Sequence, residues 1–368
     1  MAQRSGETDS PARTGEIWVL GATGRTGRAV AARLVADGVA PVLVGRDAGR
    51  LRRAAEQLGP GSGVRTVVAA TPEATADEVA RQRPAVVVNT IGDYARTALP
   101  VVRACLPGGH YVDLASDLGA MEQLAALHDE AESAGSTLVT GAGFGVLGTE
   151  AVVARLCAGR PVPARVRVDA LASVAVEAGR LGEALAASMV DVAATGGRRY
   201  AAGRLVRTRL GADVYRFTLP DGVAVTSVGA PSGELYGART ASGAPDVVAT
   251  SMLVPAAPAV RALLPVAGAL LRVPALRRLV VSRLARVELP ASPRPREHTW
   301  GHAVVTWADG TEREGWLRAG EAMDFTAAAA ATVAQRLARG EGKPGAWTPA
   351  TALGPDLAVE AGGTFVDG

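Results

Sequence analysis

The chain has 368 residues, of which 48% are hydrophobic and 20% are charged. This composition excludes a disordered protein and allows one large or two ordinary domains. The formal net charge is only +3, which is too small to indicate a nucleic acid partner. Lys343 is the only lysine, and alanine and glycine abound, as in GC-rich bacterial genes. We therefore expect a bacterial protein and give arginine clusters little weight.

The sequence gives no sign of secretion or of a membrane span. Cys105 and Cys157 are too few for a disulfide framework. Residues 1–14 are polar, lack the apolar core of a signal peptide, and are expected to form a loose tail. The apolar run 262–271 is about half as long as a membrane helix requires. We expect a cytoplasmic protein.

Short apolar runs alternate with amphipathic stretches from Ile17 to Val139. The predicted strands are 17–20, 40–45, 64–69, 85–90, 110–114 and 136–141. The predicted helices are 25–37, 47–58, 74–83, 98–105 and 120–134. Apolar strands that are separated by helices are typical of a parallel sheet covered on both faces. The pattern predicts an α/β fold with a doubly wound parallel sheet.

Longer, alternating strands follow Gly143. They are predicted at 164–177, 214–219 and 222–229 and in a hairpin over 302–319, whose turn is Asp-Gly. Helices are predicted at 182–194, within 258–287, and at 324–339. This middle portion is expected to form a mostly antiparallel sheet with helices.

A glycine-rich loop, "GATGRTG", joins the first strand to the first helix. Its glycines allow a tight turn, close approach of the backbone to a pyrophosphate, and close helix packing, while the helix N-terminus faces the negative charge. The predicted cofactor-binding residues here are Gly21, Thr23, Gly24, Arg25, Thr26 and Gly27. The alternative is an ordinary glycine-rich turn.

Two other strand ends extend the predicted cofactor site. Arg46 follows the second strand, where a carboxylate would favour NAD and an arginine suits the 2′-phosphate of NADPH. Asn89, Thr90 and Gly92 follow a later strand and are expected beside the nicotinamide ribose. We therefore expect NADPH, preferred over NADH, as the cofactor.

Several other chemistries are disfavoured. The Tyr-x-x-x-Lys pair of short-chain dehydrogenases is absent, because the residue four before Lys343 is Arg339. Neither cysteine lies in a setting typical of a nucleophile. His298 and His302 lie in a strand-like run, too far apart for one zinc ion. We expect no metal site.

Three sequence blocks together resemble a known family. They are "VLGATGRTGRAVAARL", "VVVNTIGDYARTALPVVRACLPGGHYVDLASD" and, near the end, "WTPATALGPDLAVEAGGTFV". They are similar to the saccharopine dehydrogenase-like reductases, in particular the short bacterial branch that includes trans-acting enoyl reductases. Asp93 stands where that family commonly has proline. The middle of the chain matches only in outline.

The resemblance implies a Rossmann domain over 15–145 and about 325–368, with an inserted α+β substrate and dimerisation domain over 146–324. It also implies NAD(P)H-dependent hydride transfer in biosynthesis. Some members reduce a C=N bond between an amino acid and an aldehyde, and others reduce a C=C bond of a polyketide or lipid. Residues 252–287 are apolar and broken by arginines. Core packing or a dimer interface would explain them, but they also suit an apolar substrate or weak contact with a membrane surface.

We expect a small, apolar substrate, C=C reduction and a homodimer. Tyr94 is the first candidate for proton donor or substrate hydrogen bond, because it follows the nicotinamide-side loop. His110 and Asp113 are further catalytic candidates, each with an equally plausible structural role. Two alternatives to a reductase stay open: a non-catalytic NADP-binding sensor, and a cyclase or isomerase that keeps the cofactor for structure.

Overall fold

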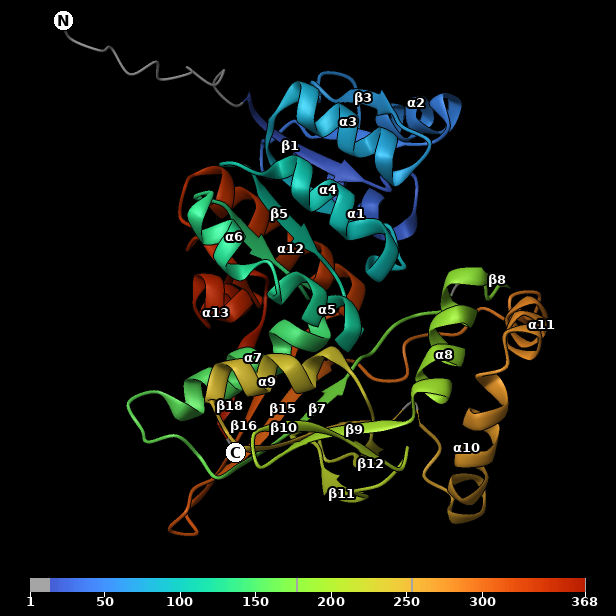
Figure 1. Ribbon diagram of the computed structural model, residues 1–368, viewed down its shortest axis with the longest axis vertical. Helices are drawn as coiled ribbons and strands as arrows, with labels where there is room; N and C mark the ends of the chain where they lie inside the picture. Colours follow the sequence, from blue (N-terminus) through green and yellow to red (C-terminus); the bar gives the residue numbers. More distant parts are fainter. Residues whose placement is uncertain (1–13, 177, 253, 368) are drawn as a thin grey trace, which may run out of the picture.

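The computed structural model describes residues 14–176, 178–252 and 254–367, so residues 1–13 of the predicted tail lie outside it. Two sheets lie one above the other in Figure 1, each with its own helices. Seven described strands form the first sheet, in the order β17-β6-β5-β4-β1-β2-β3, and the paired strands are all parallel. They are β1 (Thr14–Leu20), β2 (Val42–Gly45), β3 (Arg65–Val68), β4 (Pro84–Asn89), β5 (His110–Asp113), β6 (Thr137–Val139) and β17 (Gly345–Trp347).

Helices cover both faces of this sheet, because its strands are apolar on both sides. In β1, Ile17 and Val19 join one buried cluster while Trp18 and Leu20 join the other. The first cluster includes side chains of α1 (Arg25–Ala36), α2 (Ala48–Gln57) and α12 (Ala322–Ala338). The second includes side chains of α3 (Pro72–Gln82), α4 (Tyr94–Cys105), α5 (Leu118–Ala125) and α6 (His128–Ser133). The α/β doubly wound fold is confirmed.

The second sheet has nine described strands and is mostly antiparallel. They are β7 (Arg165–Leu171), β9 (Gly197–Ala201), β10 (Arg204–Thr208), β11 (Tyr215–Thr218), β12 (Ala224–Gly229), β13 (Asp246–Ser251), β15 (Thr299–Thr306), β16 (Glu312–Ala319) and β18 (Thr364–Asp367). Helices α7 (Phe144–Cys157) and α9 (Gly233–Ser242) pack on it, between the two sheets. The loops after β5 and β6 therefore face the second sheet's helices.

The C-terminal segment is divided between the two sheets. Helix α12 packs against the first sheet and β17 joins it, while α13 (Pro349–Leu353) and α14 (Leu357–Glu360) pack against α7. The last strand, β18, pairs instead with β16 of the second sheet. This differs from our expectation that all of 325–368 would join the first domain. The strand adds to the open edge of β16, which continues the second sheet.

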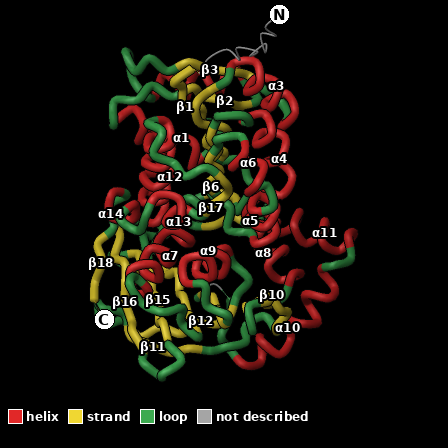
Figure 2. Tube along the Cα trace, turned by 60° about the vertical axis from the view of Figure 1, so that its left-hand side comes forward, coloured by secondary structure: helices red, strands yellow, loops and turns green. Residues whose placement is uncertain are grey.

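Helices α8 (Glu183–Thr195), α10 (Pro258–Leu271) and α11 (Pro274–Leu284) form an arm beside the second sheet, visible at the right of Figures 1 and 2. Two short strands pair with each other there: β8 (Gly179–Arg180), which precedes α8, and β14 (Glu288–Leu289), which follows α11. Within the described ranges, no single helix meets the length and hydropathy criteria for a membrane span. Helices α10 and α11 meet them only as a pair, and they are bent by 114° relative to each other.

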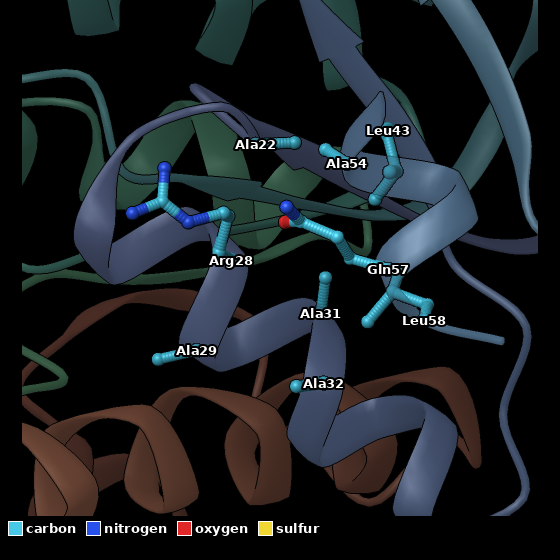
Figure 3. A pocket seen from close by; sticks show the side chains of 9 residues that line it. All are labelled: Ala22, Arg28, Ala29, Ala31, Ala32, Leu43, Ala54, Gln57 and Leu58. Atoms are coloured by element: carbon cyan, nitrogen blue, oxygen red, sulfur yellow. The ribbon is translucent and has the colours of Figure 1, made fainter. Parts of the chain in front are cut away.

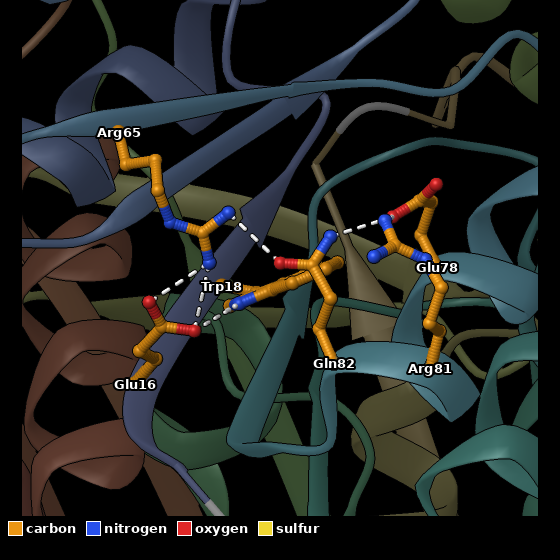
Figure 4. A network of polar contacts seen from close by, with 6 residues as sticks. All are labelled: Glu16, Trp18, Arg65, Glu78, Arg81 and Gln82. Atoms are coloured by element: carbon orange, nitrogen blue, oxygen red, sulfur yellow. Dashed lines mark hydrogen bonds and ion pairs between the residues drawn. The ribbon is translucent and has the colours of Figure 1, made fainter.

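A polar network ties β1, β3 and α3 together at the N-terminal edge of the first sheet (Figure 4). Arg65 Nη2 lies 2.8 Å from both carboxylate oxygens of Glu16, and its Nη1 donates to Gln82 Oε1 at 2.8 Å. Trp18 Nε1 donates to the same Glu16 at 3.2 Å. These side-chain contacts lie at the end of the sheet opposite to the carboxyl ends of the strands.

Candidate functional site

The strand order of the first sheet reverses between β1 and β4, and ligands of doubly wound sheets bind at the carboxyl ends of strands at such a point. The loops that follow these two strands touch. Thr90 Oγ1 donates to the Leu20 carbonyl at 2.7 Å. A Cβ added to Gly21 would lie 2.9 Å from Thr90 Oγ1. The glycine loop and the loop after β4 therefore form one surface.

The glycine loop has the backbone of a pyrophosphate-binding turn. Gly21 has a φ of +73°, which favours glycine, and its carbonyl accepts from the Gly24 amide at 2.9 Å. A Cβ on Gly27 would lie 2.4 Å from the Gly21 carbonyl oxygen, so only glycine lets α1 approach so closely. Gly24 is the exposed N-cap of α1, and no side chain caps the helix. The first-turn amides thus suit an anion, which fits a dinucleotide.

The other predicted residues of this loop lie around the same turn. Thr23 and Thr26 are half-buried, and Arg25 is exposed. Arg28, from the next turn of α1, donates to the Thr23 carbonyl at 2.7 Å and so holds the loop.

Arg46 lies at the carboxyl end of β2 and is exposed, as is Arg50. The adjacent carboxylate of Asp47 is occupied in capping α2, where it accepts from the Arg50 amide at 2.8 Å. This hydrogen bond lowers the pKa of Asp47. The corner therefore offers cationic side chains to a ligand, while its one neighbouring carboxylate serves the helix.

Asn89 is fully buried at the end of β4. Its Nδ2 donates to Tyr111 Oη at 2.9 Å, and its Oδ1 accepts from the Ile91 amide at 3.0 Å. The side chain thus shapes the loop that carries Thr90 and Gly92. Any cofactor contact of Asn89 stays a prediction and would have to be indirect.

Asp93 has a left-handed backbone, with φ 59° and ψ 51°. Proline cannot adopt this φ, so the residue that the family commonly has here would not fit this loop conformation. Aspartate tolerates it better than most residues. Asp93 also pairs with Arg96 at 3.2 Å. The departure from the family pattern therefore changes the entry into α4.

Tyr94 is the first residue of α4, a helix that begins four residues earlier than predicted. Its ring packs against a buried cluster that includes Met121 and Val146, as does Tyr236 of α9. Burial, together with the charge of Asp113, raises the pKa of Tyr94, so its hydroxyl stays protonated. The residue thus lies where the two halves of the molecule meet.

Asp113 is buried at the carboxyl end of β5. Its Oδ1 accepts from Thr140 Oγ1 at 2.8 Å and from the amides of Ala115 and Gly141 at 3.1 and 3.2 Å. Burial raises its pKa. Asp113 therefore holds the loops after β5 and β6 together.

His110 is not brought to this group. It begins β5, so it lies at the opposite edge of the sheet from Asp113, and its Nδ1 accepts from the Thr137 amide at 3.0 Å. We withdraw it from the proposed site. His302 also has a structural setting: its ring nitrogens lie 2.8 Å from Asp169 Oδ2 and 2.8 Å from Glu314 Oε1.

Glu234 is a residue of this region that sequence reasoning missed. It is the second residue of α9 and follows Gly233, which packs against Met121 and Val146. Gly145 leaves room for it, since a Cβ there would collide with Glu234 Oε1. Its Oε2 is buried and has no hydrogen-bond partner among the described residues. Burial raises its pKa. No local pattern could have shown this, because the setting depends on how α9 packs on α7.

One cavity of about 290 Å³ lies behind the glycine loop, between α1 and α2. Figure 3 shows Arg28 and Gln57 beside this space, with small alanine side chains around it. Apart from the loop's Ala22, its lining residues belong to α1, β2, α2 and the residue after α2. The cavity therefore lies apart from Tyr94 and Glu234.

The comparisons with known proteins bear on this first domain. Residues 17–139 match the family model described as the saccharopine dehydrogenase NADP binding domain. This confirms the resemblance seen in the sequence blocks and supports NADP(H) as the cofactor, while preference over NAD stays a prediction.

Curated relatives match the same share of the chain. A trans-acting enoyl reductase of Mycobacterium ulcerans is 37% identical over 143 residues, which are 37% of this chain and 34% of that protein. The Mycobacterium tuberculosis protein of the same name is 33% identical over 141 residues, with the same coverage. The match thus spans about a third of each relative. A crystal structure of a metagenomic short-chain oxidoreductase with NADP has a TM-score of 0.30 at 18% identity, over 35% of this chain and 81% of that one, too low to argue from.

Proposed function

We propose that this protein is an NADPH-dependent reductase that transfers hydride to the C=C bond of an apolar, enoyl-type substrate. The observation that supports the proposal is that three parts follow the carboxyl ends of β1, β2 and β4, which are neighbours in one sheet. They are the glycine loop, the cationic corner at Arg46, and the apolar cluster around Tyr94, Met121 and Val146. The first two suit a phosphorylated dinucleotide, and the third suits an apolar acceptor.

NADPH, when bound, supplies hydride from C4 of its nicotinamide. The loop amides and Arg46 would hold its phosphates, and the buried cluster would exclude water. We assign to Tyr94 a hydrogen bond to the carbonyl that polarises the C=C bond. Burial raises the pKa of its hydroxyl, which therefore stays protonated and can donate near pH 7 but is a poor acid there.

Glu234 is better matched to proton transfer. Burial raises the pKa of this carboxyl, and its Oε2 is buried without a hydrogen-bond partner among the described residues. In the proposed reaction, hydride adds to the β-carbon and Glu234 gives its proton to the α-carbon. NADP⁺ and the saturated product leave, and water reprotonates the carboxylate. A C=N acceptor would take hydride at carbon and the proton at nitrogen.

The direct experiment offers NADPH carrying deuterium at C4 to the enzyme with α,β-unsaturated thioesters of increasing chain length. In parallel, an amino acid and an aldehyde test the C=N alternative. We expect NADPH oxidation that rises with acyl length and deuterium on the β-carbon of the product. Turnover of the imine alone would establish the alternative. Tight NADPH binding without oxidation in either series would favour the sensor.

A further inference from the structure

The arm formed by α8, α10 and α11 carries an apolar surface that the rest of the molecule leaves uncovered. Leu263, Val266, Leu270 and Val273 are 66%, 61%, 53% and 50% exposed. Spacings of three and four residues put them on one side of α10 and its C-terminal turn. We name these four residues the outer stripe.

The opposite side of α10 is already packed. Gly268 is buried, and a Cβ there would lie 2.5 Å from the Ala193 carbonyl oxygen of α8. Leu264 and Leu271 pack against buried clusters that also contain residues of α8. Helix α10 is therefore apolar on both sides, a pattern expected of a buried helix. The packing onto α8 is too close for α10 to turn its outer stripe inward.

The charges of α10 and α11 are all of one sign. Residues 252–287 contain six arginines and no acidic residue, and the next acid is Glu288. Three of the arginines fasten the arm: Arg277 donates to Asp191 of α8 at 2.7–2.9 Å, Arg272 donates to the Ala194 carbonyl at 3.1 Å, and Arg261 donates to the Gly211 carbonyl at 2.6 Å. The others on α11 or just after it, Arg278, Arg283 and Arg286, are exposed.

We propose that the arm binds the surface of an anionic phospholipid bilayer, with the outer stripe in the acyl boundary and the arginines of α11 at the headgroups. A bilayer of acidic lipids offers both an apolar layer and a dense negative surface. The pair α10–α11 is apolar enough for a span but is bent by 114°, which suits a structure lying in the interface. A second copy fits less well, because a two-fold contact through this face would bring like-charged arginines together.

The test is co-sedimentation of the full chain with vesicles of phosphatidylcholine alone, or mixed equally with phosphatidylglycerol. We expect binding to the mixed vesicles, little binding to phosphatidylcholine, and weakening as salt rises above about 0.1 M. Leu263→Asp should reduce the affinity for mixed vesicles by about tenfold or more, because it removes a leucine that would be buried in the bilayer. The matched control is Val162→Asp, since Val162 is also 66% exposed but lies in the loop before β7.

The charge is tested separately. Arg278→Glu with Arg283→Glu should weaken binding about 30-fold, whereas Arg52→Glu with Arg53→Glu on α2 should not. The urea-unfolding midpoint of the arm variants should equal that of the unchanged protein, which verifies folding independently of the proposed function. Absence of vesicle binding, equal binding to both vesicle types, or equal losses in the control variants would overturn the proposal. So would a dimer that Leu263→Asp dissociates, because the second copy would then be the occupant.

Discussion

The hydroxyl of Thr348 donates to Glu150 Oε1 at 2.5 Å, and this bond joins residues that are 198 positions apart. Both residues are fully buried. The amides of Ala350 and Thr351 also donate to this carboxylate, at 3.0 and 2.9 Å. Glu150 lies at the middle of α7, so the C-terminal Thr-Pro-Ala-Thr segment is held against the helix between the sheets. The Thr-Pro-Ala-Thr motif therefore has a structural role in this protein.

Glu150→Gln should therefore destabilise the protein by about 1–3 kcal/mol. The NH2 group of glutamine would face a donor that hydrogen-bonds to a carboxylate oxygen in the unchanged protein. The measurement is thermal or urea unfolding at pH 7. Glu56→Gln, on the exposed face of α2, is the matched control and should change little. A stability of Glu150→Gln within the error of the unchanged protein would show that these hydrogen bonds are dispensable.

Gly27→Ala should raise the Kd for NADPH by about tenfold or more, because the new methyl group would push α1 away from the Gly21 carbonyl. Fluorescence titration of NADPH measures this. The control is Gly320→Ala, where a Cβ meets nothing within 4 Å. If Gly27→Ala binds NADPH normally while folded, the loop does not hold the pyrophosphate as we propose.

Tyr94→Phe and Glu234→Gln should separate substrate binding from proton transfer. Both should keep the Kd for NADPH, and both should lower kcat/KM, by about 10²-fold for Glu234→Gln. In Glu234→Gln the effect should fall on kcat, and the pH dependence of the rate should lose one ionisation. Unchanged turnover in either variant would remove that residue from the reaction.

The second sheet contains a buried charged group that should control stability in acid. Burial raises the pKa of Asp169, but the hydrogen bond and charge of His302, with Arg167 and Thr250, lower it overall below its usual value of 3.8. A carboxyl with a depressed folded-state pKa contributes stability above its unfolded pKa and loses it as pH falls through the folded value.

Asp169→Asn should accordingly lower the free energy of unfolding at pH 7 by about 1–3 kcal/mol, and the difference should shrink as pH falls below about 4. Urea unfolding between pH 3 and 7 measures this. A difference that is constant over that range would exclude linkage through this carboxylate.

Six of the first sheet's seven strands could be predicted because they are set by local patterns: apolar strands, amphipathic helices and glycine turns. Strand β17 was not predicted. The β9–β10 hairpin could not be predicted. Its two-residue turn is Ala202-Gly203, both with positive φ, and alanine stands where asparagine or aspartate usually signals such a turn. Helix α9 and strand β13 were also missed.

The candidate site was predictable where strand order alone fixes position. The glycine loop and Thr90 follow the ends of adjacent parallel strands and therefore meet, and Tyr94 begins the helix that follows Thr90. His110 was misplaced because a residue that begins a strand lies at the far edge. The setting of Glu234 could not be predicted, because its burial arises from the contact of α9 with α7, and these two helices are distant in the chain.

The central claim, that NADPH lies at this strand reversal with its 2′-phosphate at Arg46, is tested most directly by the affinities of Arg46→Asp for NADPH and NADH. Arg52→Asp, an exposed neighbour on α2, serves as the control. Loss of a charged hydrogen bond predicts that NADPH binding weakens by about tenfold or more in Arg46→Asp while NADH binding changes little. Equal losses for the two cofactors would contradict the assignment.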